Sequence, residues 1–428
     1  MAELAIGSVV SLQNGRSCRV KKELGRGGQG IVYVVDYEGC DYALKWYTLN
    51  YSDSFFRNLL KNAKVGAPAD NFIWPLAVSH KQNGSFGYVM KLRPKEFKDM
   101  NQFILLHAQF SSVQAQLNAC LQISTAFQSL HIRGYSYQDM NDGNFFINPQ
   151  TGDVLICDND NVAPDGTSMG ILGKPGYMAP EIVEGEKMPN KYTDYYSLAV
   201  CLFILIYMNR PFEGKRYLNC PCDANSEAAK KLFGFNSTFI MDPMDDSNRP
   251  VKGIHNNVLR RWNIYPELLQ MPFCKTFGKE ALVDQTKRFM DQQWHNLLLQ
   301  IRSMFLPCPC CGKDTFLDPD QPTKVCIWCK KSAPKYPSLK VGRFNIPLVA
   351  GQKLYECMLT GEKDFNIVSG ETMMKGAAVG LVNNSKYVWT VILPDGKPRL
   401  VNPGENMPAR QGFKIKFGNQ GETGEIVG

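Results

Sequence analysis

The chain has 428 residues, of which 44% are apolar and 21% are charged. That length suits two or three domains of the usual ~100–200 residues, and the composition excludes a largely disordered protein. Six of the eight net positive charges lie in residues 302–428, which hold 17 Lys/Arg against 11 Asp/Glu. The first residues lack the apolar core of a secretory signal, and the longest apolar run, residues 198–208, is shorter than the ~20 residues that cross a bilayer. We therefore expect a cytoplasmic protein with no membrane segment.

Short strands are expected first along the chain, and helices later. Residues 7–47 alternate apolar and polar side chains in short runs, with a turn signal at Asn14-Gly15. Residues 112–131 repeat apolar side chains at helical spacing, and helical patterns dominate residues 190–305. The pattern predicts an α+β fold for the first three quarters of the chain.

A glycine-rich turn lies between two of the expected strands. Its glycines are Gly25, Gly27, Gly28 and Gly30. Glycine lets a backbone approach phosphate oxygens closely, and a strand on either side disfavours a dinucleotide-binding turn, which leads into a helix. The motif predicts a lid over a nucleotide, with a simple glycine-rich hairpin as the alternative.

A lysine and three oxygen-bearing side chains follow at separate positions. Lys45 stands between apolar neighbours on an expected strand, where an ammonium group calls for an anion such as phosphate. Asp139 and Asn144 precede an apolar strand, and Asp158 ends the next one. Phosphoryl transfer requires a carboxylate that orients the attacking hydroxyl and oxygen ligands for Mg²⁺, and this set supplies both.

The order of these motifs, closed by Ala179-Pro180-Glu181, resembles the eukaryotic-like Ser/Thr protein kinases over about residues 19–305. The resemblance implies a bilobal kinase-like domain over residues 1–306, with lobes of about 1–92 and 93–306. It further implies transfer of the γ-phosphate of MgATP to Ser/Thr hydroxyls of a protein substrate.

The resemblance also assigns roles to residues. Asp139 and Lys45 would be catalytic, and Asn144 and Asp158 would bind Mg²⁺ (or Mn²⁺). Glu181 would pair with Arg288, and Asp194 would brace the catalytic loop. The residues implied to contact ATP are Gly25, Gly27, Gly28, Gly30, Val32, Ala43, Lys45, Met90, Lys91 and Arg93.

The helix glutamate that normally pairs with the strand lysine of these kinases is missing. No glutamate occurs between Glu38 and Glu96, and Asn58 or Asn62 on the expected helix could only donate or accept hydrogen bonds. The partner of Lys45 is therefore unknown from sequence. This gap and an altered Asp-Phe-Gly motif favour a second hypothesis, a pseudokinase scaffold that binds nucleotide without transferring phosphate.

Two further motifs depart from the family pattern. The family's Asp-Phe-Gly is Asp158-Asn159-Asp160, and we expect Asp160 to be a solvated turn acid rather than a further metal ligand. The family's His-Arg-Asp is Tyr137-Gln138-Asp139, so the loop lacks the arginine that would receive an activation-segment phosphate. Asn141 stands where Ser/Thr kinases carry a lysine.

A cysteine cluster over residues 307–331 predicts a zinc ribbon. Cys308, Cys311, Cys326 and Cys329 give the spacing C-x₂-C-x₁₄-C-x₂-C, which places four thiolates around Zn²⁺. Four sulfur ligands leave no open position, so the zinc would be structural. Cys310 is the spare thiol, because choosing it breaks the x₂ spacing.

The end of the chain predicts a linker and a small β-rich domain. The Pro-rich residues 332–345 would be the linker and residues 346–428 an all-β sandwich. Residues 376–418 resemble part of a forkhead-associated domain but lack its phosphothreonine signature, which favours a docking module.

The domain order is similar to that of bacterial kinases of tellurite-resistance systems. That similarity implies a von Willebrand A-domain protein and a metal-dependent protein phosphatase as partners. Seven Lys/Arg and no acid occur in residues 321–355, which leaves nucleic-acid binding as a weaker hypothesis.

Overall fold

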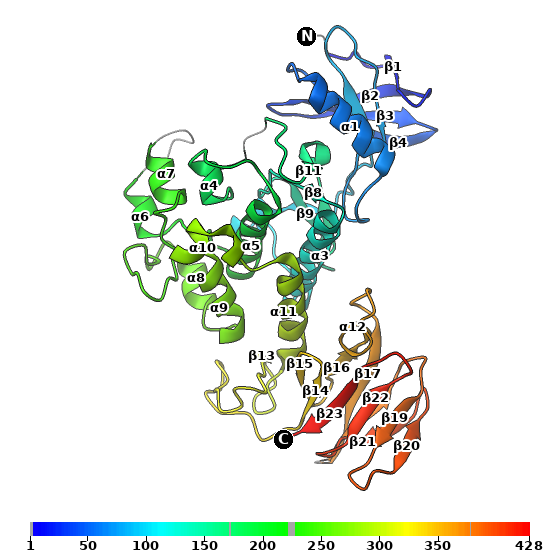
Figure 1. The fold of residues 1–428 in the computed structure, drawn as a ribbon, viewed down its shortest axis with the longest axis vertical. Coiled ribbons are helices and arrows are strands. Elements are labelled where there is room, and N and C mark those ends of the chain that lie inside the picture. Colours follow the sequence, from blue (N-terminus) through cyan, green and yellow to red (C-terminus); the bar gives the residue numbers. More distant parts are fainter. Residues whose placement is uncertain (1–2, 171–172, 221–226, 377) are drawn as a thin grey trace. The chain divides into compact units, whose positions relative to one another are not determined.

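The computed structural model describes residues 3–170, 173–220, 227–376 and 378–428 (Figure 1). No helix within these ranges combines the length and hydrophobicity that crossing a bilayer requires. The chain forms two compact units: a first unit of Met1–Leu259 with Met271–His295, and a second unit of Arg260–Gln270 with Asn296–Gly428.

A six-stranded antiparallel sheet, in the order β1-β2-β3-β4-β6-β5, begins the first unit. Val20, Val35, Leu44 and Trp46 are among the buried side chains that form its core. One helix, α1, packs on the sheet through Phe55 and is capped by Ser52. The elements are β1 (Val9–Ser11), β2 (Ser17–Arg26), β3 (Gly30–Tyr37), β4 (Cys40–Tyr47), α1 (Asp53–Val65), β5 (Ala77–Val78) and β6 (Gly87–Met90).

Helices dominate the chain from residue 100 to residue 304. Residues 193–207 of α5 are all buried, so the apolar run noted at residues 198–208 lies in a helix of the core. The helices are α2 (Met100–Ile104), α3 (Val113–Ile132), α4 (Pro180–Val183), α5 (Lys191–Tyr207), α6 (Lys215–Leu218), α7 (Glu227–Phe233), α8 (Asn256–Arg261), α9 (Glu267–Thr276), α10 (Lys279–Val283) and α11 (Asp291–Met304). Short strands carry the catalytic-loop region: β7 (Lys98–Asp99), β8 (Tyr135–Ser136), β9 (Phe145–Ile147), β10 (Val154–Ile156) and β11 (Ala163–Pro164).

The ion pair expected between Glu181 and Arg288 is confirmed. Two nitrogens of the Arg288 guanidinium donate to the two Glu181 carboxylate oxygens at 2.7 and 2.6 Å. Both residues are buried. This bidentate pair ties α4 to the segment before α11.

The second unit contains the cysteine hairpin (residues 307–331) and two β-sheets. The sheet orders are β15-β14-β23-β22-β19-β20 and β16-β17-β18-β21. A Cβ on Gly370 of β17 would collide with the ring of Trp389 on β19, so the two sheets pack face to face. The elements are β12 (Phe305–Pro307), β13 (Asp314–Phe316), β14 (Ser338–Val341), β15 (Phe344–Pro347), β16 (Lys353–Tyr355), α12 (Glu356–Leu359), β17 (Val368–Lys375), β18 (Ala378–Asn383), β19 (Trp389–Ile392), β20 (Pro398–Val401), β21 (Asn406–Pro408), β22 (Lys414–Phe417) and β23 (Thr423–Val427).

The second half of the expected linker, residues 332–345, is part of this sandwich. β14 and the start of β15 lie within it, and Leu339 pairs with Ile426 of β23. Leu339 and Val341 are buried while Lys340 is exposed, the period-2 alternation of a half-buried strand. The sequence did not predict this short strand, because the prolines beside it are typical of a linker.

We expect Arg288→Met to lower the free energy of unfolding by about 3–5 kcal/mol, because Glu181 would stay buried without a cation. Urea-induced unfolding followed by tryptophan fluorescence measures this loss. Arg26→Met is the matched control, since Arg26 binds Glu3 and Glu23 at the surface, where ion pairs contribute little. Similar losses in the two variants would contradict the prediction.

Candidate functional site

The four glycines of the β2–β3 turn differ in what surrounds them. A Cβ on Gly30 would collide with the backbone oxygen of Trp46, so close strand packing requires glycine there. Gly25, Gly27 and Gly28 are exposed, and, apart from their neighbours in sequence, no atom of the described chain lies within 4 Å of a Cβ built on them. Open space beside an exposed glycine turn is what a lid over phosphates needs.

Four of the side chains implied to contact ATP lie on adjacent strands. Val32 is opposite Lys45 in the β3–β4 register, and Ala43 is opposite Met90 in the β4–β6 register. Ala43 is buried, whereas Val32 and Met90 are partly exposed. One sheet therefore carries all four residues.

Lys91 and Arg93 follow β6, and both are exposed. The guanidinium of Arg93 donates to the backbone oxygen of Phe97 at 2.7 Å and lies 4.0 Å from the ring centre of Phe146. These contacts hold the Arg93 side chain, which leaves the backbone of residues 91–93 for the predicted nucleotide contacts.

Lys45 lies at the centre of a buried polar cluster. Its ammonium group donates to the side-chain oxygen of Gln29 at 2.7 Å and forms ion pairs with Asp158 at 3.2 Å and Asp160 at 2.9 Å. The lysine side chain is 7% exposed. Burial alone would lower the pKa of Lys45, but the carboxylates of Asp160 and Asp158 raise it above its usual range. The cluster joins the glycine turn to the segment after β10.

The expectation that Asp160 is a solvated turn acid was wrong. Its side chain is 0% exposed, and its Oδ2 atom binds the Lys45 ammonium and accepts a hydrogen bond from the Tyr47 hydroxyl. The three-residue helix Asn159–Asn161 turns the chain inward directly after Asp158, whose own side chain is 43% exposed. Asp158 adopts a left-handed backbone with φ of 52°, a conformation that is costly outside glycine and is concentrated at functional sites.

Helix α1, which lacks the glutamate of the family, is attached to the segment after Asp158 through two side-chain amides. The side-chain nitrogens of Asn58 and Asn62 on α1 both donate to the backbone oxygen of Val162, each at 2.8 Å. These contacts agree with the expectation that the two asparagines serve only in hydrogen bonding. They fix α1 to the same segment that carries Asp160.

The catalytic-loop candidates converge on Asp139. Asn141 donates to the carboxylate of Asp139 at 3.0 Å, and Asn161 donates to its other oxygen at 3.4 Å. Asn144 donates from its amide nitrogen to the backbone oxygen of Asp139 at 2.8 Å. The amide oxygen of Asn144 is thus left for a cation, as a metal ligand requires.

Burial raises the pKa of Asp139. The hydrogen bond from Asn141 lowers it, and the nearby carboxylates of Asp158 and Asp160 raise it again, to about 6 in all. A carboxylate with that pKa is ionised at neutral pH and accepts a proton more readily than an ordinary aspartate.

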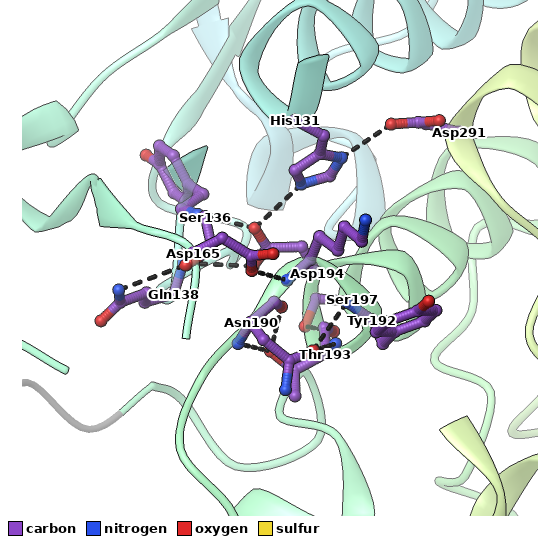
Figure 2. Close-up of polar contacts among 12 residues, drawn as sticks. His131, Ser136, Gln138, Asp165, Asn190, Tyr192, Thr193, Asp194, Ser197 and Asp291 are labelled. Carbon is purple, nitrogen blue, oxygen red and sulfur yellow. Dashed lines mark hydrogen bonds and ion pairs between the residues drawn. The ribbon is translucent and has the colours of Figure 1, made fainter. Parts of the chain in front are cut away.

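The predicted brace by Asp194 is confirmed, and it has a histidine partner that the sequence did not suggest (Figure 2). The carboxylate of Asp194 accepts hydrogen bonds from the backbone nitrogens of Tyr137 at 2.6 Å and Gln138 at 3.1 Å. His131, at the end of α3, bridges Asp194 at 3.0 Å and Asp291 at 2.7 Å. Burial opposes its charge, but the hydrogen bonds to both carboxylates raise the pKa of His131 to about 9.

The residues that replace the family's histidine and arginine make other contacts. The Tyr137 hydroxyl donates to the backbone oxygen of Cys157, next to Asp158. The Gln138 side chain donates to the backbone oxygen of Thr167 at 2.7 Å. The loop is therefore linked both to Cys157, directly after β10, and to Thr167, beyond β11.

A second buried acid, Asp142, was not singled out from sequence. It forms ion pairs with Lys174 at 2.5 Å and Arg210 at 2.9 Å. The hydrogen bond and charge of Lys174, with the charge of Arg210, outweigh burial and lower the pKa of Asp142. Its place beside a catalytic motif was the only signal that could have pointed to Asp142. Its two partners lie 32 and 68 residues away, so the ion pairs could not be predicted from spacing.

The four cysteines predicted to bind zinc lie together in the second unit. Their sulfur atoms are all within 4.8 Å of one another, with 4.0 Å between Cys308 and Cys329 and 3.9 Å between Cys311 and Cys326. A tetrahedral site with Zn–S bonds of ~2.3 Å needs sulfur separations of about 3.8 Å. The donor set therefore fits Zn²⁺, and the spare Cys310 is exposed.

Residues 18–261, more than half of the chain, match the family model for the protein kinase domain. The chain belongs to this family. Protein kinase C-like 1 of Caenorhabditis elegans is 24% identical over 205 residues, which cover 45% of this chain and 28% of that protein. Protein kinase C delta type of Mus musculus is 28% identical over 209 residues, covering 45% of this chain and 30% of that protein.

A third relative is the probable serine/threonine-protein kinase CCRP1 of Zea mays. It is 28% identical over 166 residues, which cover 36% of this chain and 24% of that protein. The chain thus spans less than a third of each of these three relatives. The family model itself ends at residue 261, before the cysteine cluster and the two β-sheets that follow.

We expect the bridge through His131 to make stability depend on pH. Its folded pKa of about 9 lies above the ~6.5 of an unfolded histidine, so the bridge stabilises the fold by about 3 kcal/mol below pH 6.5 and loses this as pH rises through 9. His131→Gln should remove this component, measured by urea unfolding between pH 6 and 9.5. His107→Gln, at an exposed histidine, is the control. A His131→Gln variant with the wild-type pH dependence would contradict the assignment.

We expect the wild type and Cys310→Ser to bind one zinc per chain. Cys326→Ser should retain roughly a tenth of that or less, because removing one thiolate breaks the tetrahedral set. Mass-spectrometric metal analysis after purification measures the content, and thermal unfolding should show a lower transition for Cys326→Ser alone. Equal zinc in both variants would exclude the four-cysteine site.

Proposed function

We propose that the chain is a Ser/Thr protein kinase that transfers the γ-phosphate of MgATP to a protein substrate. The observation that carries this proposal is the convergence of four groups in one unit: the Asp139 carboxylate, the Asn144 amide, and the Lys45 ammonium paired with Asp158. The relatives named as serine/threonine kinases support the class of acceptor hydroxyl.

Bound MgATP supplies the phosphoryl group, and its cation neutralises charge on the phosphates. Lys45 would hold the α- and β-phosphates, and Asp139 would accept the proton of the substrate hydroxyl. Asn144 and Asp158 would bind Mg²⁺ (or Mn²⁺); the partial exposure of Asp158 suits a group that must reach the cation. The exposed turn of Gly25, Gly27 and Gly28 would cover the phosphates, and the side chains of Val32, Ala43 and Met90, with the backbone of residues 91–93, would face the adenine.

The pseudokinase alternative rested on two features, the altered Asp-Phe-Gly motif and the missing helix glutamate. Lys45 nevertheless has two carboxylate partners in the structure, so the missing glutamate is no longer an argument against catalysis. A nucleotide-binding scaffold would still bind MgATP but would transfer no phosphate to any protein, and the experiment below separates the two.

The second unit is proposed to recruit substrates. Its cysteine hairpin would hold structural zinc, and its two sheets are compatible with the forkhead-associated-like sandwich that we propose. A von Willebrand A-domain protein and a metal-dependent phosphatase are the partners suggested by similarity to tellurite-associated bacterial kinases, in a cytoplasmic setting. Exposed lysines such as Lys324, Lys330 and Lys331 would suit an acidic partner surface.

Transfer of labelled phosphate from ATP to a mixture of protein substrates tests the function. We expect Asp139→Asn to lower kcat by about 10³-fold with little change in MgATP affinity, because the base acts on the acceptor and not on the nucleotide. Asp158→Asn should weaken both transfer and Mg²⁺-dependent binding. Asp36→Asn, at a surface ion pair with Lys21, is the control. Transfer that survives both site substitutions would sink the proposal.

A further inference from the structure

We infer that Asp160 is the positioning residue for Lys45 and takes the place of the helix glutamate that protein kinases normally use. This inference rests on the proposed kinase function and assigns a role to a residue that the family motif does not include. Protein kinases require an ion pair to hold the strand lysine against the phosphates. In this chain the carboxylate comes from the segment that follows the metal-binding aspartate.

The contacts around Asp160 distinguish it from Asp158. Oδ2 of Asp160 binds the Lys45 ammonium at 2.9 Å and also accepts a hydrogen bond from the Tyr47 hydroxyl, while its side chain is 0% exposed. Asp158 lies farther from the ammonium, at 3.2 Å, and its side chain is 43% exposed. An exposed acid can turn to a cation, whereas a buried acid bound by two donors is held in place. Asp158 is therefore free to bind metal while Asp160 keeps Lys45 in position.

The position of Asp160 is fixed by its surroundings. Asn159 donates from its side chain to the backbone oxygens of Ile73 and Ile156, each at 2.8 Å. Asn58 and Asn62 of α1 hold Val162, two residues beyond Asp160. Both flanks of the carboxylate are thus anchored, and α1 acts by supporting this segment rather than by contributing a charge.

A double-mutant cycle tests the assignment. The variants are Lys45→Met, Asp160→Asn and the double substitution, and the readouts are kcat/KM for phosphotransfer and the Kd of MgATP by calorimetry. We expect Asp160→Asn to lower kcat/KM by about 10–100-fold, as a misplaced catalytic group does. Asp160→Asn alone should also raise the Kd of MgATP, whereas in the Lys45→Met background the same substitution should change this Kd by less than about threefold, because there is no ammonium left to position.

The Mg²⁺ dependence of ATP binding distinguishes lysine positioning by Asp160 from a metal-ligand role. The result expected for the positioning role is as follows in the two variants. Asp158→Asn should raise the Mg²⁺ concentration that gives half-maximal ATP binding by more than about tenfold, whereas Asp160→Asn should leave it nearly unchanged. A shift in Asp160→Asn as large as that in Asp158→Asn would overturn the inference. Full additivity of Asp160→Asn and Lys45→Met in the Kd cycle would also overturn it.

The experiment separates this inference from the proposed function. A wild type that binds MgATP but transfers no phosphate would refute kinase activity, while the Kd cycle would still decide the role of Asp160. A wild type that binds no MgATP would refute both. If Asp160→Asn does not fold, comparison of the double variant with Lys45→Met decides, since neither leaves an unpaired buried ammonium. Asp36→Asn with Lys21→Met, a lysine–aspartate pair on the surface of the same sheet, is the matched control and should leave every readout unchanged.

Discussion

The buried ammonium of Lys45 is the constraint around which the candidate site is arranged. A charge with 7% exposure requires neutralising groups nearby, because its water has been removed. Asp158 and Asp160 supply this charge, and Gln29 adds a hydrogen bond from the glycine turn. The ion cluster thereby joins the sheet that carries Lys45 to the segment that carries the metal-binding candidate. Phosphates could replace one of these partners without leaving the lysine uncompensated.

A second buried charge gives the catalytic loop its rigidity. Asp194 accepts two backbone hydrogen bonds from the loop that leads to Asp139. His131 carries a positive charge that offsets the negative charges of the buried Asp194 and Asp291. The candidate base is therefore positioned by groups on α3, α5 and the start of α11. Such preorganisation is what a phosphotransfer site relies on, since the protein supplies mainly placement and electrostatics.

The residues that could be predicted from the sequence are those that lie in short sequence motifs. Asp139 and Asn144 lie in one short motif, and the four clustered cysteines lie in two C-x₂-C pairs, so their proximity could be predicted from their spacing. Asp160 could not be found in this way, because Lys45 lies 115 residues before it and burial of a short turn is a tertiary effect. The signals were present, a missing helix glutamate and an extra acid two residues beyond Asp158, but only packing connects them. Leu339 was missed for a similar reason, since its strand is defined by pairing with the end of the chain.

The two departures from the kinase pattern have a common physical consequence. In each, a residue near the catalytic motifs makes a contact that differs from the family's: Asp160 binds Lys45, and the Gln138 side chain donates to the backbone oxygen of Thr167. Neither contact requires phosphorylation or movement of α1, because the partners already lie within hydrogen-bond distance in the folded chain. Movement of α1 would change the site chiefly by displacing Val162 and, with it, Asp160. Control of this kinase domain would therefore act on the Asp158–Val162 segment itself, where the candidate metal ligand Asp158, the Lys45 partner Asp160 and the α1 attachment at Val162 lie within five residues.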